Sequence, residues 1–447
     1  MLFSFQKYVN PIWYFNLHPE IAGPVYFPDW DELTESEKSY LNWQPGYSSE
    51  NVSKLDIAWQ AWQKGVICSN EGQRLDIREI QPSVSDNYLF LRNYFHPIWG
   101  YYVLLIRLIS LHNPIREFLS FFKTRKAKRQ ALFGKVFYHG AGYTDFISGL
   151  MKKSPLVTVI IPTLNRYNYL KDALIDLEQQ DYSNFEVIII DQSEPFQADF
   201  YRSFRLNLKV IHQEEKALWL ARNTAIEQSA AEFLLLYDDD SRVEKDWISQ
   251  HLKCLDYFGA DISSGVSISK VGAKVPENYS FFRWGDQLDT GNVMIRRDVF
   301  RKIGLFDRQF EKQRMGDGEF GLRAYLAGFK NISNPYAQRL HLKGAEGGLR
   351  QMGSWDGFRS KNWLAPRPIP SVLYLARKYF GNLAALRLLM ISVPPSLIPY
   401  RFKGNKAMMI LGIPIAIVML PFVLIQVTRS WRLSSRMIKA GEKIKLI

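Results

Sequence analysis

Two short runs of apolar, mostly β-branched residues place the strongest constraint on how this chain can fold. They occupy residues 157–161 and 186–190 and suit strands that are buried on both faces of a parallel sheet. Between them, Leu170, Leu174 and Leu177 recur at helical spacing. A strand, a helix and a second strand in this order form a βαβ unit. The pattern therefore predicts an α/β fold.

A third apolar run, residues 233–237, ends directly in Asp238, Asp239 and Asp240. In open α/β sheets, ligands bind at the carboxyl ends of the strands. Clustered carboxylates repel one another and are driven towards protonation unless a cation lies among them. Mg²⁺ binds one or two carboxylates together with the phosphates of a substrate. The triplet therefore indicates a divalent-metal site, although a solvated turn or a helix N-cap is an alternative.

The composition is that of a globular chain, whose 447 residues are enough for two or three domains. The two cysteines, Cys68 and Cys254, make no disulfide framework and no metal cluster, so we expect a reducing compartment. The N-terminal residues lack the basic and apolar segments of a secretory signal, and none is expected. Residues 1–150 carry half of the tryptophans and no recognisable catalytic motif. We interpret them as an accessory region of unknown role, with an aromatic core or an interface.

Two local signals stand out within this accessory region. Thr34 and Glu37 have the spacing of a capping box ahead of a short helix. Pro114 suits the first turn of a helix that runs into a basic stretch ending near Arg129. Together with the apolar residues 98–111, this stretch predicts a surface element that lies on a membrane, and a solvated helix face explains it equally well.

Residues 351–447 form a basic and apolar C-terminal region. From Met352 onward there are fifteen Lys or Arg against two acids, so this region carries the whole net charge of +13. Residues 407–427 are uncharged and match the length of a membrane-spanning helix, but Pro414 and Pro421 interrupt them. We expect a kinked, re-entrant or half-inserted element on an anionic membrane, with no nucleic-acid partner. A buried core helix is the alternative.

Further segments between residues 156 and 343 complete a recognisable pattern. In chain order they read VTVIIPTLNR at 157–166, FEVIIIDQS at 185–193, LARN at 220–223, DDD at 238–240, TGN at 290–292, GLFD at 304–307 and GDGEFGLR at 316–323. In order and spacing, this set resembles the inverting family 2 glycosyltransferases. The resemblance implies a GT-A fold, a Rossmann-like, mostly parallel sheet flanked by helices, at residues 151–350.

The resemblance also implies roles for individual residues. Those expected to contact the nucleotide-sugar donor are Pro162, Thr163, Asp191, Arg222, Asn223 and Asp238. Asp240 and His341 would hold a divalent metal, Mg²⁺ or Mn²⁺, and Asp317 would be the catalytic base, with Glu319 as the rival. Each has a structural alternative: a strand-end cap for Asp191, a helical salt bridge for Arg222, a packed side chain for His341 and a turn for Asp317.

The sequence departs from the family pattern in three places. Where the family commonly has Asp-Asp-Gly-Ser, residues 191–194 read DQSE, and Gly316 replaces a glutamate before the expected base. Processive synthases of this superfamily carry Gln-x-x-Arg-Trp, whereas residues 351–355 read QMGSW. The missing arginine argues against a processive synthase, and Trp355 would stack on an acceptor sugar or pack in a core.

These observations predict a metal-dependent inverting glycosyltransferase at the cytoplasmic face of the inner cell membrane. Its partners would be a nucleotide-sugar donor, a glycan or lipid-linked saccharide acceptor, and membrane lipids. The alternatives are a polyprenyl-phosphate sugar synthase and a non-catalytic, membrane-bound scaffold. A nucleotidyltransferase would need a Gly-rich loop with Arg and Lys after the first strand, which residues 162–166 do not provide.

Overall fold

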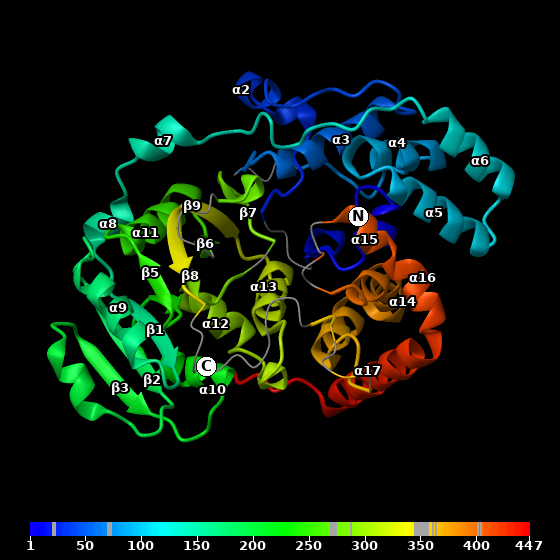
Figure 1. Ribbon diagram of the computed structural model, residues 1–447. Coiled ribbons are helices and arrows are strands. Elements are labelled where there is room, and N and C mark those ends of the chain that lie inside the picture. The colour runs from blue at the N-terminus through cyan, green and yellow to red at the C-terminus, as the bar shows by residue number, and fades with distance from the viewer. Residues whose placement is uncertain are drawn as a thin grey trace. The chain divides into compact units, whose positions relative to one another are not determined.

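The computed structural model describes residues 1–19, 24–68, 74–268, 275–286, 288–343, 357–359, 362, 364–399, 402 and 405–447. The chain forms two compact units (Figure 1). Unit 1 comprises Met1–Asp145 and Pro276–Trp284, and unit 2 comprises Phe146–Val275 and Gly285–Ile447. The division into regions 1–150, 151–350 and 351–447 stays a prediction. The QMGSW segment at 351–355 lies outside the described residues.

Unit 1 is mainly helical. Its helices are α1 (Gln6–Val9), α2 (Glu35–Lys38), α3 (Glu50–Gln63), α4 (Val84–Tyr94), α5 (Ile98–Ile109), α6 (Pro114–Lys123) and α7 (Gly140–Thr144). The capping box predicted at Thr34 and Glu37 is confirmed at α2, and Pro114 is confirmed in the first turn of α6. Trp59 and Trp62 of α3 are buried in edge-to-face contact with Trp13, so for these residues the aromatic-core interpretation holds.

Unit 2 is built on a mixed sheet with the order β3-β2-β1-β4-β8-β6-β9-β5. The strands are β1 (Val157–Thr163), β2 (Phe185–Asp191), β3 (Leu208–His212), β4 (Phe233–Tyr237), β5 (Ser241–Val243), β6 (Ile262–Ile268), β8 (Asn292–Arg296) and β9 (Asn331–His341). The first four strands in the order pair in parallel, as do β6 and β9. Strand β8 runs antiparallel to β4 and β6, and β5 runs antiparallel to β9. The predicted α/β fold is confirmed.

Helices cover both faces of this sheet: α8 (Gly149–Lys153), α9 (Tyr167–Glu178), α10 (Leu218–Gln228), α11 (Trp247–Phe258), α12 (Arg297–Ile303) and α13 (Gly316–Leu326). Side chains of a strand alternate between faces, so Leu234 and Leu236 of β4 share one core with α10, α12 and α13. Tyr237 points the other way and contacts Trp247 of α11. Complete burial of each leucine side chain contributes about 2 kcal/mol.

The strand register brings several polar residues to one edge of the sheet. Thr163 at the end of β1 is paired with Asp191 at the end of β2. Tyr237, the last residue of β4, is paired with Asn292 at the start of the antiparallel β8. His341 at the end of β9 is paired with Ser241, which follows the Asp triplet. The carboxyl ends of four strands therefore meet at this edge.

Four helices follow the sheet: α14 (Pro370–Ser396), α15 (Lys406–Ile410), α16 (Gly412–Val418) and α17 (Leu420–Ala440). Tyr374 and Leu375 of α14 belong to the same core as β4, so this helix is part of the unit. Within the described ranges no single helix is long and apolar enough to cross a membrane. Helices α16 and α17 meet that test together, bent by 90° at Met419.

The last residues of the chain return to the GLFD segment of unit 2. The amide of Leu305 donates to the carbonyl of Lys445 at 2.9 Å, and the amide of Lys443 donates to Asp307 at 2.9 Å. A Cβ on Gly304 would lie 2.5 Å from Ile444, so this contact needs glycine. Residues 443–445 therefore cover the GLFD segment.

Candidate active site

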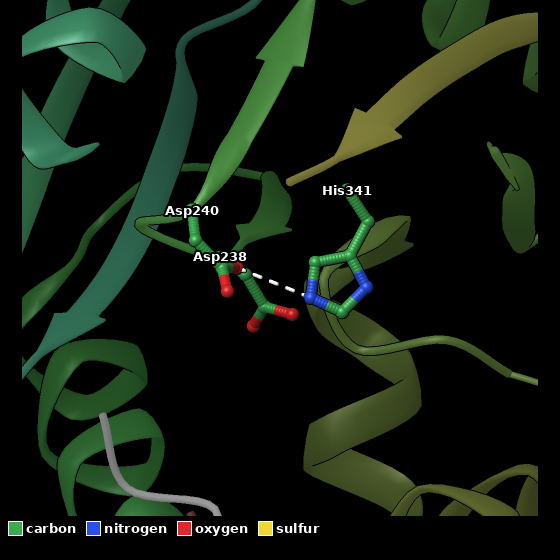
Figure 2. Close-up of side chains that lie close together, drawn as sticks. All are labelled: Asp238, Asp240 and His341. Carbon is green, nitrogen blue, oxygen red and sulfur yellow. Dashed lines mark ion pairs between the residues drawn. The ribbon is translucent and has the colours of Figure 1, made fainter. Parts of the chain in front are cut away.

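Two aspartates of the triplet and one histidine form the centre of the site. Asp238 and Asp240 follow β4, and His341 ends β9 and points towards them (Figure 2). One ligand atom from each lies within 4.8 Å of the others. His341 Nε2 is 3.2 Å from Asp240 Oδ1. The structure thus brings together both predicted metal ligands, with Asp238 beside them.

Two buried arginines fix the carboxylate of Asp238. Arg222 of α10 donates to Oδ1 at 2.8 Å, and Arg339 of β9 donates to Oδ2 at 2.9 Å. Gly291, between them in the chain, has no room for a side chain, because a Cβ would lie 2.1 Å from Arg339 and 2.2 Å from Asp238. The TGN segment therefore contains glycine where it passes over this ion pair.

Arg339 is the hub of a wider polar network. It also donates to Asp289 at 2.8 Å, to Ser241 at 2.9 Å and to Ser267 at 2.7 Å. Burial works to lower the pKa of this guanidinium, but the carboxylates of Asp289 and Asp238 outweigh burial and raise the pKa. Arg339 is therefore a fixed positive charge under the site.

The loop after β1 contributes a third arginine. Arg166 donates to Asp239 at 3.1 Å and to Asp240 at 2.9 Å, and Thr163 donates to Asp239 at 2.8 Å. Burial raises the pKa of Asp239 to about 7, against the opposing charge of Arg166. Burial also acts to raise the pKa of Asp240, but the hydrogen bond from His341 and the neighbouring positive charges bring it below the ordinary value.

Asp191 lies at the same edge with its side chain fully buried. Its Oδ2 accepts from the hydroxyls of Tyr167 and Tyr201, each at 2.7 Å, and its Oδ1 accepts from the amide of Ser193 at 2.8 Å. Pro162 is buried in β1, beside Ile190. Asp191 thus holds two aromatic rings at the edge of the sheet, and its predicted contact with the nucleotide stays a prediction.

Asn223 on α10 is hydrogen-bonded to the backbone of the GLFD segment. Its Nδ2 donates to the carbonyl of Phe306 at 2.9 Å, and its Oδ1 accepts from the amide of Phe306 at 3.0 Å. Both ends of the side-chain amide are therefore bonded to backbone. The predicted role of Asn223 in orienting the sugar or phosphates stays a prediction.

Asp317 begins α13, next to the contact that joins this helix to α10. A Cβ on Gly316 would lie 2.4 Å from the ring of Trp219, so the helices approach closely here. The guanidinium of Arg222 lies 5.3 Å from that ring and binds Asp238. This chain of contacts ties the start of α13 to the aspartate triplet, and the Asp317 carboxylate is partly exposed.

Glu319, two positions along, is in a different environment. Its side chain is fully buried and forms an ion pair with Arg323 at 2.8 Å. It also accepts from the hydroxyl of Tyr379 on α14, and Lys378 lies 3.8 Å away. Glu319 therefore joins α13 to α14, whereas Asp317 is partly exposed.

Sequence reasoning missed two arginines of the bonded cluster, Arg166 and Arg339, and gave Asp239 of the triplet no role of its own. Arg166 lies inside the VTVIIPTLNR segment, and Arg339 is two residues before His341 on the same strand. Because buried carboxylates need positively charged partners, the aspartate triplet itself indicated that basic side chains must lie nearby. Nothing local to the sequence pairs these arginines with particular aspartates.

The donor set suits a divalent cation. Two carboxylates within 4.8 Å of each other supply the oxygen atoms that Mg²⁺ and Mn²⁺ prefer, and the imidazole of His341 adds one nitrogen atom, a ligand typical of softer metals. Asp238 is already oriented by its two arginines, and Asp240 by Arg166 and His341. The site is therefore organised by this chain's own ion pairs.

Comparisons with known proteins show which proteins this chain is similar to. The model of the family described as "Glycosyl transferase family 2" matches residues 158–307. Putative glycosyltransferase EpsH of Bacillus subtilis is 31% identical over 105 residues, 23% of this chain and 30% of that protein. Glycosyltransferase AglE of Haloferax volcanii is 28% identical over 193 residues, 39% of this chain and 63% of that protein. The chain thus spans less than two thirds of either relative.

Solved structures with related folds include two transferases. A mannosyltransferase of Pyrobaculum calidifontis, solved with GDP-Man and Mn²⁺, has 16% identity and a TM-score of 0.43, covering 66% of this chain and 90% of its own. TarS of Staphylococcus aureus, residues 1–349 solved with UDP-GlcNAc, has 20% identity and a TM-score of 0.41. The match covers 64% of this chain and 83% of the TarS chain.

Proposed function

We propose that this chain, whose residues 158–307 match the family 2 glycosyltransferase model, is a metal-dependent inverting transferase that acts at a membrane. The donor is a nucleotide sugar and the acceptor is a hydroxyl of a glycan or lipid-linked saccharide. The observation that carries the proposal is the convergence of Asp238, Asp240 and His341 within 4.8 Å at the carboxyl edge of the sheet.

Asp240 and His341 hold the metal ion, with Asp238 adjoining it. When bound there, a divalent cation neutralises negative charge on the departing nucleoside diphosphate. Arg166 forms ion pairs with Asp239 and Asp240 and is the N-cap residue of α9 (Tyr167–Glu178). A helix N-terminus and a guanidinium both favour a phosphate group. This supports a diphosphate position between the β1 loop and the aspartates.

Asp317 acts on the acceptor side. Its carboxylate takes the proton of the acceptor hydroxyl while that oxygen bonds to the anomeric carbon. The bond from this carbon to the diphosphate oxygen breaks on the opposite face, so the configuration inverts. The exposure of Asp317 and the burial of Glu319 in its own ion pair favour Asp317 for this role.

The membrane part of the proposal rests on the C-terminal helices. Their outward side chains are apolar, including Ile413, Ile417, Val418 and Leu424, and basic residues flank them. Such a surface favours an anionic bilayer and, with it, an acceptor carried by a lipid. Because the acceptor precursor is made where nucleotide sugars are available, we place the protein at the cytoplasmic face of the inner membrane.

The test compares Asp240→Asn and Asp317→Asn in the purified full-length protein. Thermal shift with a nucleoside diphosphate, with and without Mn²⁺, measures binding, and release of diphosphate from the donor measures transfer. We expect Asp240→Asn to lose the Mn²⁺-dependent shift and transfer. Asp317→Asn should keep the shift and lose transfer by about 10²–10⁴-fold.

Asp199→Asn is the matched control, because this carboxylate lies in the same domain and is 86% exposed. It should behave as the wild type. Transfer at the wild-type rate by both site variants would contradict the assignment. Binding without transfer by the wild type would favour the non-catalytic scaffold instead.

A further inference from the structure

A second surface, in unit 1, presents apolar side chains to solvent on two adjacent helices. Helices α5 and α6 pack against each other and against α4 (Figure 1). We define the α5–α6 face by its exposed apolar residues, which are Tyr101, Leu105, Ile109, Ile115, Phe118, Leu119 and Phe122. On α6 they recur at the spacing of one helical face, with Ile115 70% and Leu119 68% exposed. Contiguous apolar patches of this kind mark interaction sites.

Helix α6 buries two polar residues, Glu117 and Ser120, together with Phe121, whereas most of its apolar side chains are exposed. The buried side of α6 carries Glu117, which accepts from Arg107 of α5 at 2.6 Å and from Tyr88 of α4 at 2.9 Å. Burial acts to raise the pKa of Glu117, but the bonds from Arg107 and Tyr88 outweigh burial and lower it. The charged pair therefore faces inwards and the apolar side chains face outwards.

Contacts from α4 hold α6 in this orientation. Arg92 donates to the carbonyl of Phe121 at 3.1 Å and to the hydroxyl of Thr124 at 3.1 Å. Its guanidinium also lies 4.4 Å from the centre of the Phe121 ring. Turning α6 to bury the apolar face would break these bonds and strip Glu117 of its partners, at a cost of several kcal/mol. The exposure is therefore built into the packing.

A cluster of positive charge adjoins the apolar face. The exposed residues that follow Phe122 include Lys123, Arg125, Lys126, Lys128 and Arg129, and residues 118–144 contain no Asp or Glu. An apolar face next to cationic side chains is complementary to the acyl boundary and anionic head groups of a bilayer. Nucleic acid would match the charges and leave the apolar face exposed.

We propose that the α5–α6 face docks on an anionic lipid bilayer. The apolar side chains enter the boundary between head groups and acyl chains, and the basic cluster lies against the head groups. This inference goes beyond the proposed function, because the face lies outside residues 158–307 and binds lipid whether or not sugar is transferred.

A fluorophore placed on the face tests the docking directly. Both native cysteines are buried, and burial raises the pKa of Cys68 and of Cys254 to about 12, so a thiol introduced by Leu119→Cys is labelled selectively at pH 7. The full-length protein, carrying a polarity-sensitive label, is mixed with vesicles of phosphatidylcholine, with or without phosphatidylglycerol. We expect a blue shift on the anionic vesicles, and no shift for a label introduced by Ser36→Cys on α2.

Paired charge variants test the basic cluster. Lys126→Gln with Lys128→Gln should weaken the response of the Leu119→Cys label roughly fivefold for each lysine. Lys152→Gln with Lys153→Gln removes the same charge from α8 of unit 2 and should leave the response unchanged. Added salt should weaken it in the wild type, because head-group attraction is screened.

Three results would overturn the proposal. One is an unshifted label on every vesicle. Another is an equal shift with and without phosphatidylglycerol, because the basic cluster would then contribute nothing. The third is a label that is already shielded in buffer and becomes exposed on dilution, which would mean that a second copy of the chain covers the face. Donor binding and sugar transfer are measured in separate assays, so that failure of the proposed function can be distinguished from failure of the docking proposal.

Discussion

Asp239, the middle residue of the triplet, differs from its neighbours in what it contacts. Strand β4 ends at Tyr237 and the chain turns at Asp239 and Asp240. Asp238 and Asp240 lie near His341, whereas Asp239 accepts hydrogen bonds from Thr163 and Arg166. Its bonds join the β1 loop to the end of β4. The triplet therefore combines two acids at the cation site with one acid that supports the loop beside it.

The pKa of Asp239 leads to a prediction about stability. Because burial raises its pKa from 3.8 to about 7, the folded state holds this proton more tightly than the unfolded chain does. Its contribution to the free energy of unfolding is therefore full below about pH 4, is lost as the pH rises to about 7, and is constant above that. With metal chelated, we expect the Tm of Asp239→Asn relative to wild type to rise between pH 5 and pH 8.

Thermal melts of both proteins across this pH range measure the difference. Asp199→Asn should show the same Tm offset at every pH, because that carboxylate is exposed. A constant offset for Asp239→Asn would mean that the carboxyl of Asp239 titrates near its ordinary pKa.

At the scale of single residues, the sequence identified the aspartates of the site more readily than the arginines that pair with them. Consecutive aspartates after a buried strand are a local signal, and residues 233–240 carry it within eight positions. Arg339 lies 101 positions from Asp238, and only the register of β9 beside β5 brings them together. An arginine in a strand looks like any solvent-facing residue until its partner strand is known.

Among the elements, α13 separates the two candidate bases. Its first turn exposes Asp317 beside the contact of Gly316 with Trp219, and its next residues bury Glu319 against Arg323 and α14. The two acids are two positions apart, yet Asp317 is partly exposed and Glu319 is fully buried in an ion pair. The two acids of α13 are therefore expected to have different roles, Asp317 in catalysis and Glu319 in stability.

This difference predicts opposite outcomes for two conservative variants. Glu319→Gln should lower the free energy of unfolding by about 3 kcal/mol, because Arg323 is left without its ionic partner in a buried site. Transfer per folded molecule should stay within about tenfold of wild type. Asp317→Asn should leave Tm unchanged and abolish transfer. Melting curves measure the stability of each variant, and initial rates measure its transfer. Loss of transfer by Glu319→Gln at an unchanged Tm would identify Glu319 as the catalytic base.

The elements themselves were predictable in part. The βαβ unit at 157–190 and the strand before the triplet follow from periodicity alone, and the structure has all of them. The insertion of the antiparallel β8 between β4 and β6 was not predictable, because period-two patterning defines a strand and not its neighbour. The cation site depends on that pairing, since Thr290 and Gly291 precede β8 and contact Arg222 and Asp238.

Across unit 2 as a whole, α17 resembles α6 in burying polar side chains. Its inward side chains include Gln426, Ser430 and Ser434, which are buried, while Leu424 and Ile425 are about half exposed. Gln426 accepts from Arg367 at 2.9 Å, and Ser434 accepts from Arg377 at 2.7 Å. A 90° bend at Met419 precedes this helix, and it fits both the kinked and the re-entrant alternatives for this segment. Contact of these helices with a membrane stays a proposal.

Two substitutions at the bend test that proposal. Ile417→Glu with Val418→Glu should weaken binding to anionic vesicles by roughly tenfold or more for each side chain, because burial of each contributes about 2 kcal/mol. Both positions are well exposed, at 68% and 82%, so the fold should be unaffected. Ile147→Glu with Tyr336→Glu, which are also exposed, is the matched control. Equal vesicle binding by both double variants would mean that the C-terminal helices do not contact the membrane.

The return of residues 443–445 to the segment Gly304–Asp307 has a consequence for how the protein is made. Translation is directional, so α14 to α17 leave the ribosome before the strand-like stretch that closes over Leu305. Until that stretch emerges, the GLFD corner beside Asn223 lacks its cover. Helices α14 to α17 are therefore complete before the segment Gly304–Asp307 receives its C-terminal cover.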